Sequence, residues 1–138
     1  MPNVENFLKL AAVLESSIPQ ASFDMSLVAH GQSGLELTPE HVCNSGTVAC
    51  AIGWAPAYVA PAIKGEDWQD YCERVFDIEW CSEEWEFIFG GGWSCVDDTP
   101  QGAGARVRYF LDKGLPDPDL DFKDLLEIYA PYLIKEQS

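Results

Sequence analysis

The sequence predicts a mainly α-helical fold: a single globular domain over residues 1–138, with about five or six helices and room for one short β-hairpin. Several segments repeat their apolar residues at helical spacing. The same segments are bounded by helix-capping residues, proline or glycine. Hydrophobic residues make up 47% of the 138 residues, which is enough apolar area to form a core and argues against disorder.

The first predicted helix covers residues 4–17. Asn3 can cap its start and Pro19 ends it. Its apolar side chains are Phe7, Leu8, Ala11, Val13 and Leu14. The stretch up to residue 46 mixes alternating apolar residues with Gly, Ser and Asn, which predicts an irregular segment that can hold the hairpin.

A second helix is predicted from Thr47, which is a suitable capping residue. The following stretch, "VACAIGWAPAYVA", is apolar nearly all the way round, so this helix is expected in the middle of the fold. Gly53 would let a neighbouring segment approach closely, and Pro56 is expected to end or kink the helix.

An amphipathic helix is predicted over residues 65–77, and a short helix, "EEWEFIF", from the cap Ser82 to Gly90. The apolar face of the longer helix carries Trp68, Tyr71, Cys72, Val75 and Phe76.

The strongest start and stop signals are Thr99 with Pro100, and Gly114. They enclose a helix whose apolar stripe is Ala103, Val107, Phe110 and Leu111. A last helix begins near Asp121, is interrupted at Pro131, and is expected to bury Leu125, Leu126 and Tyr129.

The charge of the chain is strongly acidic. Against 23 acids stand 8 basic residues, for a formal net charge of −15. Such a surface repels nucleic acid and anionic lipid and attracts basic partners. The start lacks a basic leader before an apolar stretch, and no apolar run is long enough to cross a membrane, so a cytoplasmic protein is expected.

Acidic residues concentrate between residues 66 and 86, which hold nine acids and one arginine. On a continuous helix, Glu66, Asp70, Glu73 and Asp77 would form one stripe opposite the apolar face. The predicted partner-binding residues are this stripe together with Glu83, Glu84 and Glu86. The alternative is that the acids form a solvated face serving solubility alone.

The five cysteines are odd in number and lack a Cys-x-x-Cys pair, which favours reduced thiols. If a helix began at Thr47, Cys50 would lie in its first turn, where amides and the helix dipole stabilise a thiolate. His41 or His30 would then be the base of a cysteine hydrolase or transferase. Packing of Cys50 as a small apolar residue is the favoured interpretation.

A zinc site from His41, Cys43 and Cys50 would need a fourth ligand from Cys72, Cys81 or Cys95, and no metal or cofactor is predicted.

Two further features have a chemical and a structural interpretation. Asp97 and Asp98 could bind a cation or act as an acid and a base, but acids just ahead of a helix are also favoured by its dipole. Trp93, beside three glycines, could line a groove, and is more simply explained as a lid on the core.

The pieces "CNSGTVACAIGWAP", "YCERVFDI" and "EWEFIFGGGWSCVDDTPQGAGARVRYFLDKGLP" follow one another in order. This set resembles a family of small uncharacterised proteins from bacteria and their phages, with a Cys-Gly-Thr-x-x-Cys-Ala-x-Gly motif, a Trp-Phe segment and Asp-Asn/Asp-Thr-Pro. The match spans roughly residues 43 to 116. This chain departs from the pattern by Asn44 and Ser45, which stand between the first cysteine and Gly46. The resemblance implies a bacterial or phage origin and a shared fold, but no activity.

The sequence therefore predicts a small, acidic, noncatalytic interaction protein that binds a basic face of a partner protein, for instance to inhibit a nucleic-acid-binding or defence protein of the host. The alternative is the cysteine-dependent enzyme built on Cys50 and His41.

Overall fold

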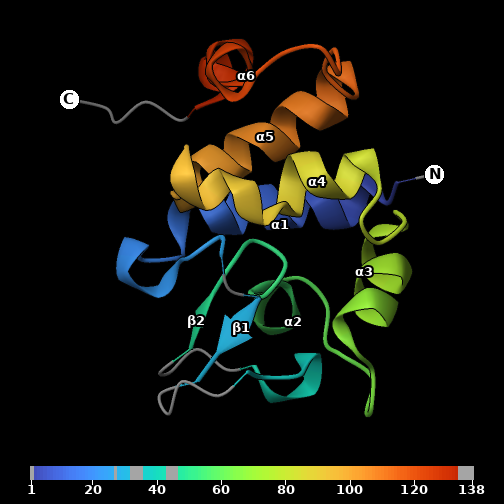
Figure 1. The fold of residues 1–138 in the computed structure, drawn as a ribbon. Coiled ribbons are helices and arrows are strands. Elements are labelled where there is room, and N and C mark those ends of the chain that lie inside the picture. The colour runs from blue at the N-terminus through green and yellow to red at the C-terminus, as the bar shows by residue number, and fades with distance from the viewer. Residues whose placement is uncertain (1, 27, 32–35, 43–46, 134–138) are drawn as a thin grey trace.

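The computed structural model describes residues 2–26, 28–31, 36–42 and 47–133. In these ranges the chain forms six α-helices, four short 3-10 helices and one two-stranded sheet, so the predicted mainly α fold is confirmed (Figure 1). The 3-10 helices are η1 (Gln20–Ser22), η2 (Pro39–His41), η3 (Gly91–Cys95) and η4 (Ala130–Tyr132). None of the described helices has the length and apolar character needed to cross a membrane.

Helices α1 (Val4–Ser16) and α5 (Pro100–Lys113) pack side by side across the middle of the molecule (Figure 1). Their capping agrees with the prediction: the side chain of Asn3 accepts a hydrogen bond from the Asn6 amide, and Thr99 accepts one from the Gly102 amide. Arg108 of α5 donates two hydrogen bonds to the buried carboxylate of Glu15, at 2.9 and 2.7 Å, which links the two helices.

The prediction of a helix from Thr47 is wrong. Residues Val48–Ala49 form strand β2, which pairs antiparallel with β1 (Ala29–His30), and a turn then leads into the short helix α2 (Ala55–Tyr58). An apolar stretch without helical periodicity serves equally well as a buried strand and turn, and backbone pairing decides between them. Pro56 lies in the first turn of α2, where proline is tolerated, and therefore neither ends nor kinks a longer helix.

Gly53 has the close neighbour that the sequence predicted. A Cβ at this position would lie 1.8 Å from the carbonyl oxygen of Val28, so only glycine fits against the segment leading into β1. The contact holds the turn after β2 against the sheet.

Helix α3 (Trp68–Phe76) is shorter than predicted. Asp67 caps its start by accepting a hydrogen bond from the Asp70 amide, and Asp77 ends it in the left-handed region, at φ 55°. Helix α4 (Glu83–Phe89) begins at the cap Ser82 and ends before Gly90, as predicted. Glu66 and Asp77 therefore lie outside α3, one on each side of it.

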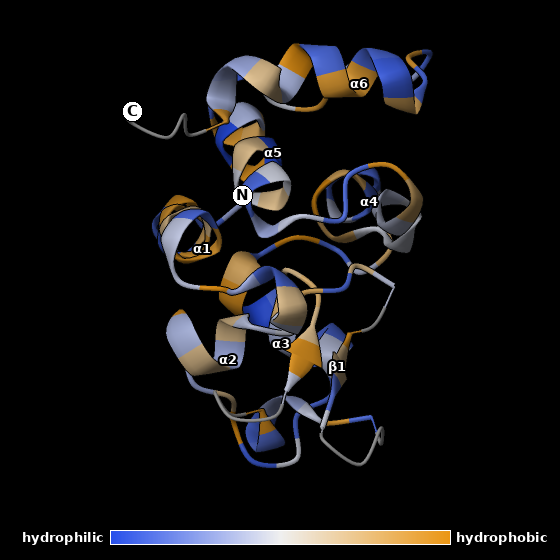
Figure 2. Cartoon of the chain, turned by 90° about the vertical axis from the view of Figure 1, so that its left-hand side faces the viewer, coloured by the Kyte–Doolittle hydropathy of each residue, from blue (hydrophilic) through white to orange (hydrophobic). Residues whose placement is uncertain are grey.

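Helix α6 (Phe122–Tyr129) begins after its cap Asp121 and lies beyond α5, above α4 in Figure 2. Tyr129 is buried as predicted, whereas Leu125 and Leu126 are half-buried. η4, which contains Pro131, follows at once.

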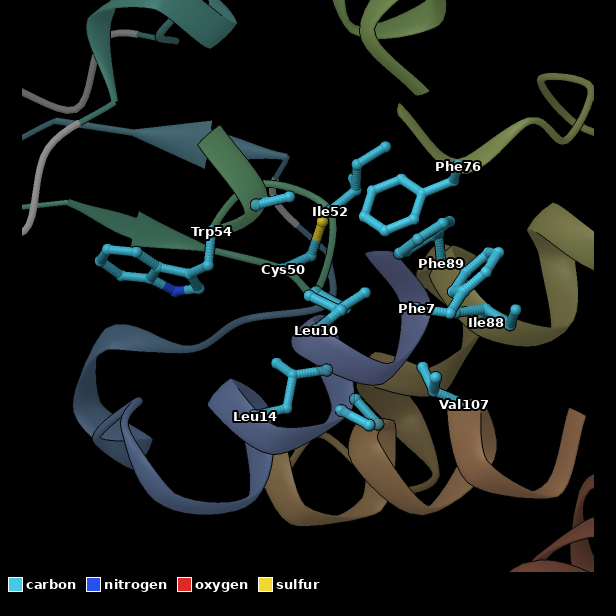
Figure 3. Close-up of a cluster of buried hydrophobic side chains, with 14 of the residues drawn as sticks. Phe7, Leu10, Leu14, Cys50, Ile52, Trp54, Phe76, Ile88, Phe89 and Val107 are labelled. Atoms are coloured by element: carbon cyan, nitrogen blue, oxygen red, sulfur yellow. The ribbon is translucent and has the colours of Figure 1, made fainter. Parts of the chain in front are cut away.

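The core lies between α1, α5, α3, α4 and the segment around β2 (Figure 3). Its centre is a cluster of phenylalanine rings, in which Phe7 lies 4.8 Å from Phe76 and 6.3 Å from Phe89 between ring centroids. All six described α-helices and both described strands thus contribute to one apolar cluster, with Cys50 and Ile52 on its sheet side (Figure 3).

Candidate binding surface

The structure separates the predicted acidic stripe into residues with different roles. Glu66 precedes α3, and both of its carboxylate oxygens accept hydrogen bonds from Arg74, at 2.7 and 2.8 Å. Its side chain is only 7% exposed, and it also accepts from the Ile63 amide. Arg74 holds the pKa of Glu66 below its usual value through these bonds. Glu66 is therefore a structural residue, and the prediction of four carboxylates on one helical face is wrong.

The acids that remain on the surface lie on α3, on α4 and in the segment between these helices, where Glu79 is exposed. Asp70 and Glu73 are exposed on α3, and Glu83 and Glu86 are exposed on α4, with Glu84 half-buried between them. Asp77 is exposed at the end of α3. We refer to Asp70, Glu73, Glu79, Glu83, Glu84 and Glu86 as the acidic face.

Like charges are crowded around Asp70. Its pKa is raised, first of all by the neighbouring carboxylate of Asp67, and further by Glu73 and Glu66. The one arginine between residues 66 and 86 is already engaged by Glu66. The acidic face thus lacks a basic side chain from its own segment to neutralise it.

A groove of about 340 Å³ opens next to this face, between α4 with η3 on one side and the segment from Leu115 into α6 on the other. Its walls are predominantly apolar and include Phe87, Trp93, Leu115, Leu120, Phe122 and Leu125. Three carboxylates also line it, those of Glu83, Glu86 and Asp117, and none of the lining residues that the structure describes is basic. Of its lining residues, the sequence analysis pointed only to Trp93 as a candidate groove residue, because the two walls are about thirty residues apart in the chain.

Trp93 fills both of the roles that the sequence left open. It is 1% exposed and donates a hydrogen bond from its indole N–H to the carbonyl of Phe87, so it belongs to the core. It also forms part of the wall of the groove, where Phe122 packs edge-on against it with 5.1 Å between ring centroids.

Cys50 does not have the environment of a nucleophile. It follows strand β2 instead of opening a helix, is 2% exposed, and its thiol donates to the carbonyl of Val28 at 3.7 Å. Burial raises the pKa of this thiol to about 11, which disfavours the thiolate at neutral pH. His41 lies in η2 and its Nδ1 pairs with the Thr38 hydroxyl at 2.6 Å.

Cys43 lies outside the described residues, and so does any zinc site that depends on it. Within the described ranges, no group of three or more His, Cys, Asp or Glu side chains is placed to hold a metal ion.

Asp97 and Asp98 both make hydrogen bonds within the fold. The carboxylate of Asp97 accepts from the hydroxyls of Thr99 and Tyr129, and that of Asp98 accepts from the Met25 amide at 2.6 Å. The cap of α5 is Thr99 itself, and the two acids fasten the chain ahead of it.

Arg106 is a buried charge that the sequence analysis missed. It is 0% exposed, and its guanidinium carbon lies 4.1 Å from the centre of the Trp93 ring. Its Nη1 lies 3.4 Å from the Tyr129 hydroxyl and 3.8 Å from Asp97, while Nε and Nη2 have no hydrogen-bond partner among the described residues. A signal was present, because Arg106 stands three residues after Ala103 and four before Phe110, within the apolar stripe.

Comparison of the chain with protein-family models, with curated proteins and with solved structures found no significant match.

Proposed function

We propose that this protein is a noncatalytic binding protein whose acidic face engages a basic surface of a partner protein. The observation that carries the proposal is the set of exposed carboxylates on α3 and α4, while the one arginine of residues 66–86, Arg74, is bound by Glu66. Like charges held this close oppose one another, as the raised pKa of Asp70 indicates, and a cationic partner relieves that repulsion.

The chemistry of such a partner is that of a basic nucleic-acid-binding surface. Carboxylates on a folded face can occupy a groove that otherwise takes phosphates, because both are anionic and accept hydrogen bonds from Arg and Lys. We therefore propose that the protein inhibits a nucleic-acid-binding or defence protein, in the cytoplasm of a bacterial host if it is encoded by a phage.

The test is capture of partners from bacterial lysate at low and high salt, followed by association kinetics with the captured protein. The variant Asp70→Asn, Glu73→Gln, Glu84→Gln removes three charges of the acidic face. It should slow association at least about threefold at low salt, and the difference should shrink as salt rises, because ions screen exposed charges beyond about 10 Å at 0.1 M.

A matched control removes three exposed charges outside the acidic face: Asp119→Asn, Asp124→Asn, Glu127→Gln. This control should associate at nearly the wild-type rate. Equal slowing by both variants would mean that net charge alone steers the partner, and equal rates for all three proteins at every salt concentration would overturn the proposal.

A further inference from the structure

The groove beside α4 combines features that the acidic face alone does not explain. It is bounded by Phe87 and Trp93 on one side and by Leu120 and Phe122 on the other, and Phe122 is 45% exposed. A volume of about 340 Å³ is at the small end of ligand pockets, and it suits one large apolar side chain with its neighbours better than a bulky cofactor.

The charged residues that line the groove in the described part of the chain are all acidic, and they come from both walls. Glu83 and Glu86 stand three residues apart on α4 and are exposed, and Asp117 lies in the opposite wall. Asp117 is oriented by the Asp119 amide, which donates to its Oδ1 at 2.9 Å. An anionic occupant would be repelled, and a purely apolar one would desolvate these carboxylates without pairing them.

The walls of the groove are pre-formed. A Cβ on Gly92 would lie 3.2 Å from the Phe122 ring, so glycine lets that ring pack against Trp93. Pro116 and Pro118 stiffen the opposite wall, since each proline fixes its own backbone φ. Little ordering of the protein would therefore accompany binding.

We propose that this groove binds a peptide segment of the basic partner, in which one large apolar side chain enters between Trp93 and Leu120 and flanking Arg or Lys residues pair with Glu83, Glu86 and Asp117. The inference rests on the proposed function and names its partner chemistry. Glu83 and Glu86 belong to both the groove and the acidic face, which places the segment at the edge of the wider charged contact.

The test is a nuclear magnetic resonance titration of the ¹⁵N-labelled protein with three synthetic tetrapeptides. The first is acetyl-Arg-Leu-Trp-Arg-amide, the second replaces both Arg by Glu, and the third replaces Leu-Trp by Ser-Ser. The first should bind at least about tenfold more tightly than either of the others, with amide shifts centred on the groove. Equal affinity for the first and third peptides, or shifts centred elsewhere, would overturn the inference.

Two double variants then separate the groove from charge in general. Glu83→Gln with Glu86→Gln should weaken binding of the first peptide at least about fivefold. Glu79→Gln with Glu84→Gln removes the same charge from the same segment outside the groove lining, and should change the affinity less than about twofold. Equal loss in both pairs would show non-specific attraction and would overturn the inference.

A second measurement needs no substitution. Cys81 lines the groove and is exposed, whereas Cys95 is exposed outside the lining. A saturating concentration of the first peptide should slow the alkylation of Cys81 at least about threefold, because an occupied groove shields its rim. The alkylation rate of Cys95 should not change. If Cys81 reacts at the same rate with and without peptide, the groove is not the site.

The groove inference and the proposed function can fail separately. If the peptide tests fail but partner association is still slowed by the variant Asp70→Asn, Glu73→Gln, Glu84→Gln, the groove inference is wrong and the proposed function stands.

Discussion

At the scale of single residues, Arg106 is a charge held in the core by aromatic rings and one carboxylate. Its guanidinium is stacked on Trp93, touches Tyr129 and lies 3.8 Å from Asp97. Burial lowers its pKa, yet arginine stays protonated in proteins. Within the part of the chain that the structure describes, two of its nitrogens have no hydrogen-bond partner, so the charge is incompletely satisfied there.

This arrangement predicts that two substitutions, one of Arg106 and one of Asp97, change the free energy of unfolding by different amounts. Arg106→Met keeps much of the volume against the rings and removes the unpaired donors, so it should change the free energy of unfolding by less than about 1 kcal/mol. Asp97→Asn leaves the buried guanidinium without its carboxylate and should cost about 3 kcal/mol. Urea unfolding followed by tryptophan fluorescence measures both. A larger loss for Arg106→Met would show that the guanidinium itself holds the rings together.

The thiols make a second prediction at this scale. Burial raises the pKa of Cys50 to about 11 and raises that of Cys72 as well, whereas Cys81 and Cys95 are exposed. At pH 8 the thiolate form of Cys50 is therefore strongly disfavoured. Iodoacetamide should therefore modify Cys81 and Cys95 before Cys50 and Cys72 in the native protein, as read by peptide mass spectrometry, with all four reacting in urea. Rapid, selective modification of native Cys50 would instead restore the nucleophile hypothesis.

At the scale of elements, α3 depends on an ion pair that spans its start. Arg74 donates to both carboxylate oxygens of Glu66 and also, from Nη2, to the Pro61 carbonyl at 3.2 Å. The turn before α3 is thereby tied to its last turn. The pKa of Asp70, on the same helix, is shifted in the opposite direction to that of Glu66. It is raised by the neighbouring acids Asp67, Glu73 and Glu66.

The two acids should therefore respond oppositely to removal of their charge. Glu66→Gln should lower the free energy of unfolding by about 1 kcal/mol at pH 7, since a bidentate pair is lost. Asp70→Asn should leave stability unchanged or raise it slightly, because like-charge repulsion is relieved. Thermal unfolding of both variants beside wild type is the measurement, and a stabilised Glu66→Gln protein would contradict the prediction.

The contribution of Glu66 to the free energy of unfolding should depend on pH in a definite direction. The folded pKa of Glu66 is below its ordinary value of 4.5, so its contribution is complete above that value and is lost as the pH falls through the folded pKa. The difference between wild type and Glu66→Gln should accordingly be constant from pH 7 to about 5 and shrink below 4.5. A difference that grew on acidification would exclude this pair as its source.

At the scale of the whole molecule, the net charge of −15 opposes the folded state, because folding brings the carboxylates closer together. Half of the 8 basic residues, Lys9, Arg74, Arg106 and Arg108, already lie within ion-pair distance of an acid of the chain. Salt screens the residual repulsion between exposed groups.

Raising NaCl from about 0.01 M to 0.15 M should therefore raise the midpoint of thermal unfolding by a few degrees, equivalent to about 1 kcal/mol. Calorimetry at pH 7 measures the change, and the acidic-face variant Asp70→Asn, Glu73→Gln, Glu84→Gln should show a smaller one. A midpoint that fell with salt would mean that attractive pairs outweigh repulsion in this fold.

Local signals in the sequence determined the helices that carry their own start and stop. Asn3, Ser82, Thr99 and Asp121 cap helices by forming hydrogen bonds three residues ahead, and Gly114 ends α5, so short-range geometry suffices to place them. The acidic character of the chain follows equally from composition alone.

Only the tertiary structure decided the rest. Whether the apolar stretch after Thr47 became a helix or a strand depended on pairing with Ala29 and His30, and that pairing determined the environment of Cys50. The partner of Glu66, the ring cage of Arg106 and the groove beside α4 each join residues distant in sequence. Periodicity reports which face of one segment is apolar, whereas these features depend on which segments meet, and that is fixed by burial and hydrogen bonding across the whole fold.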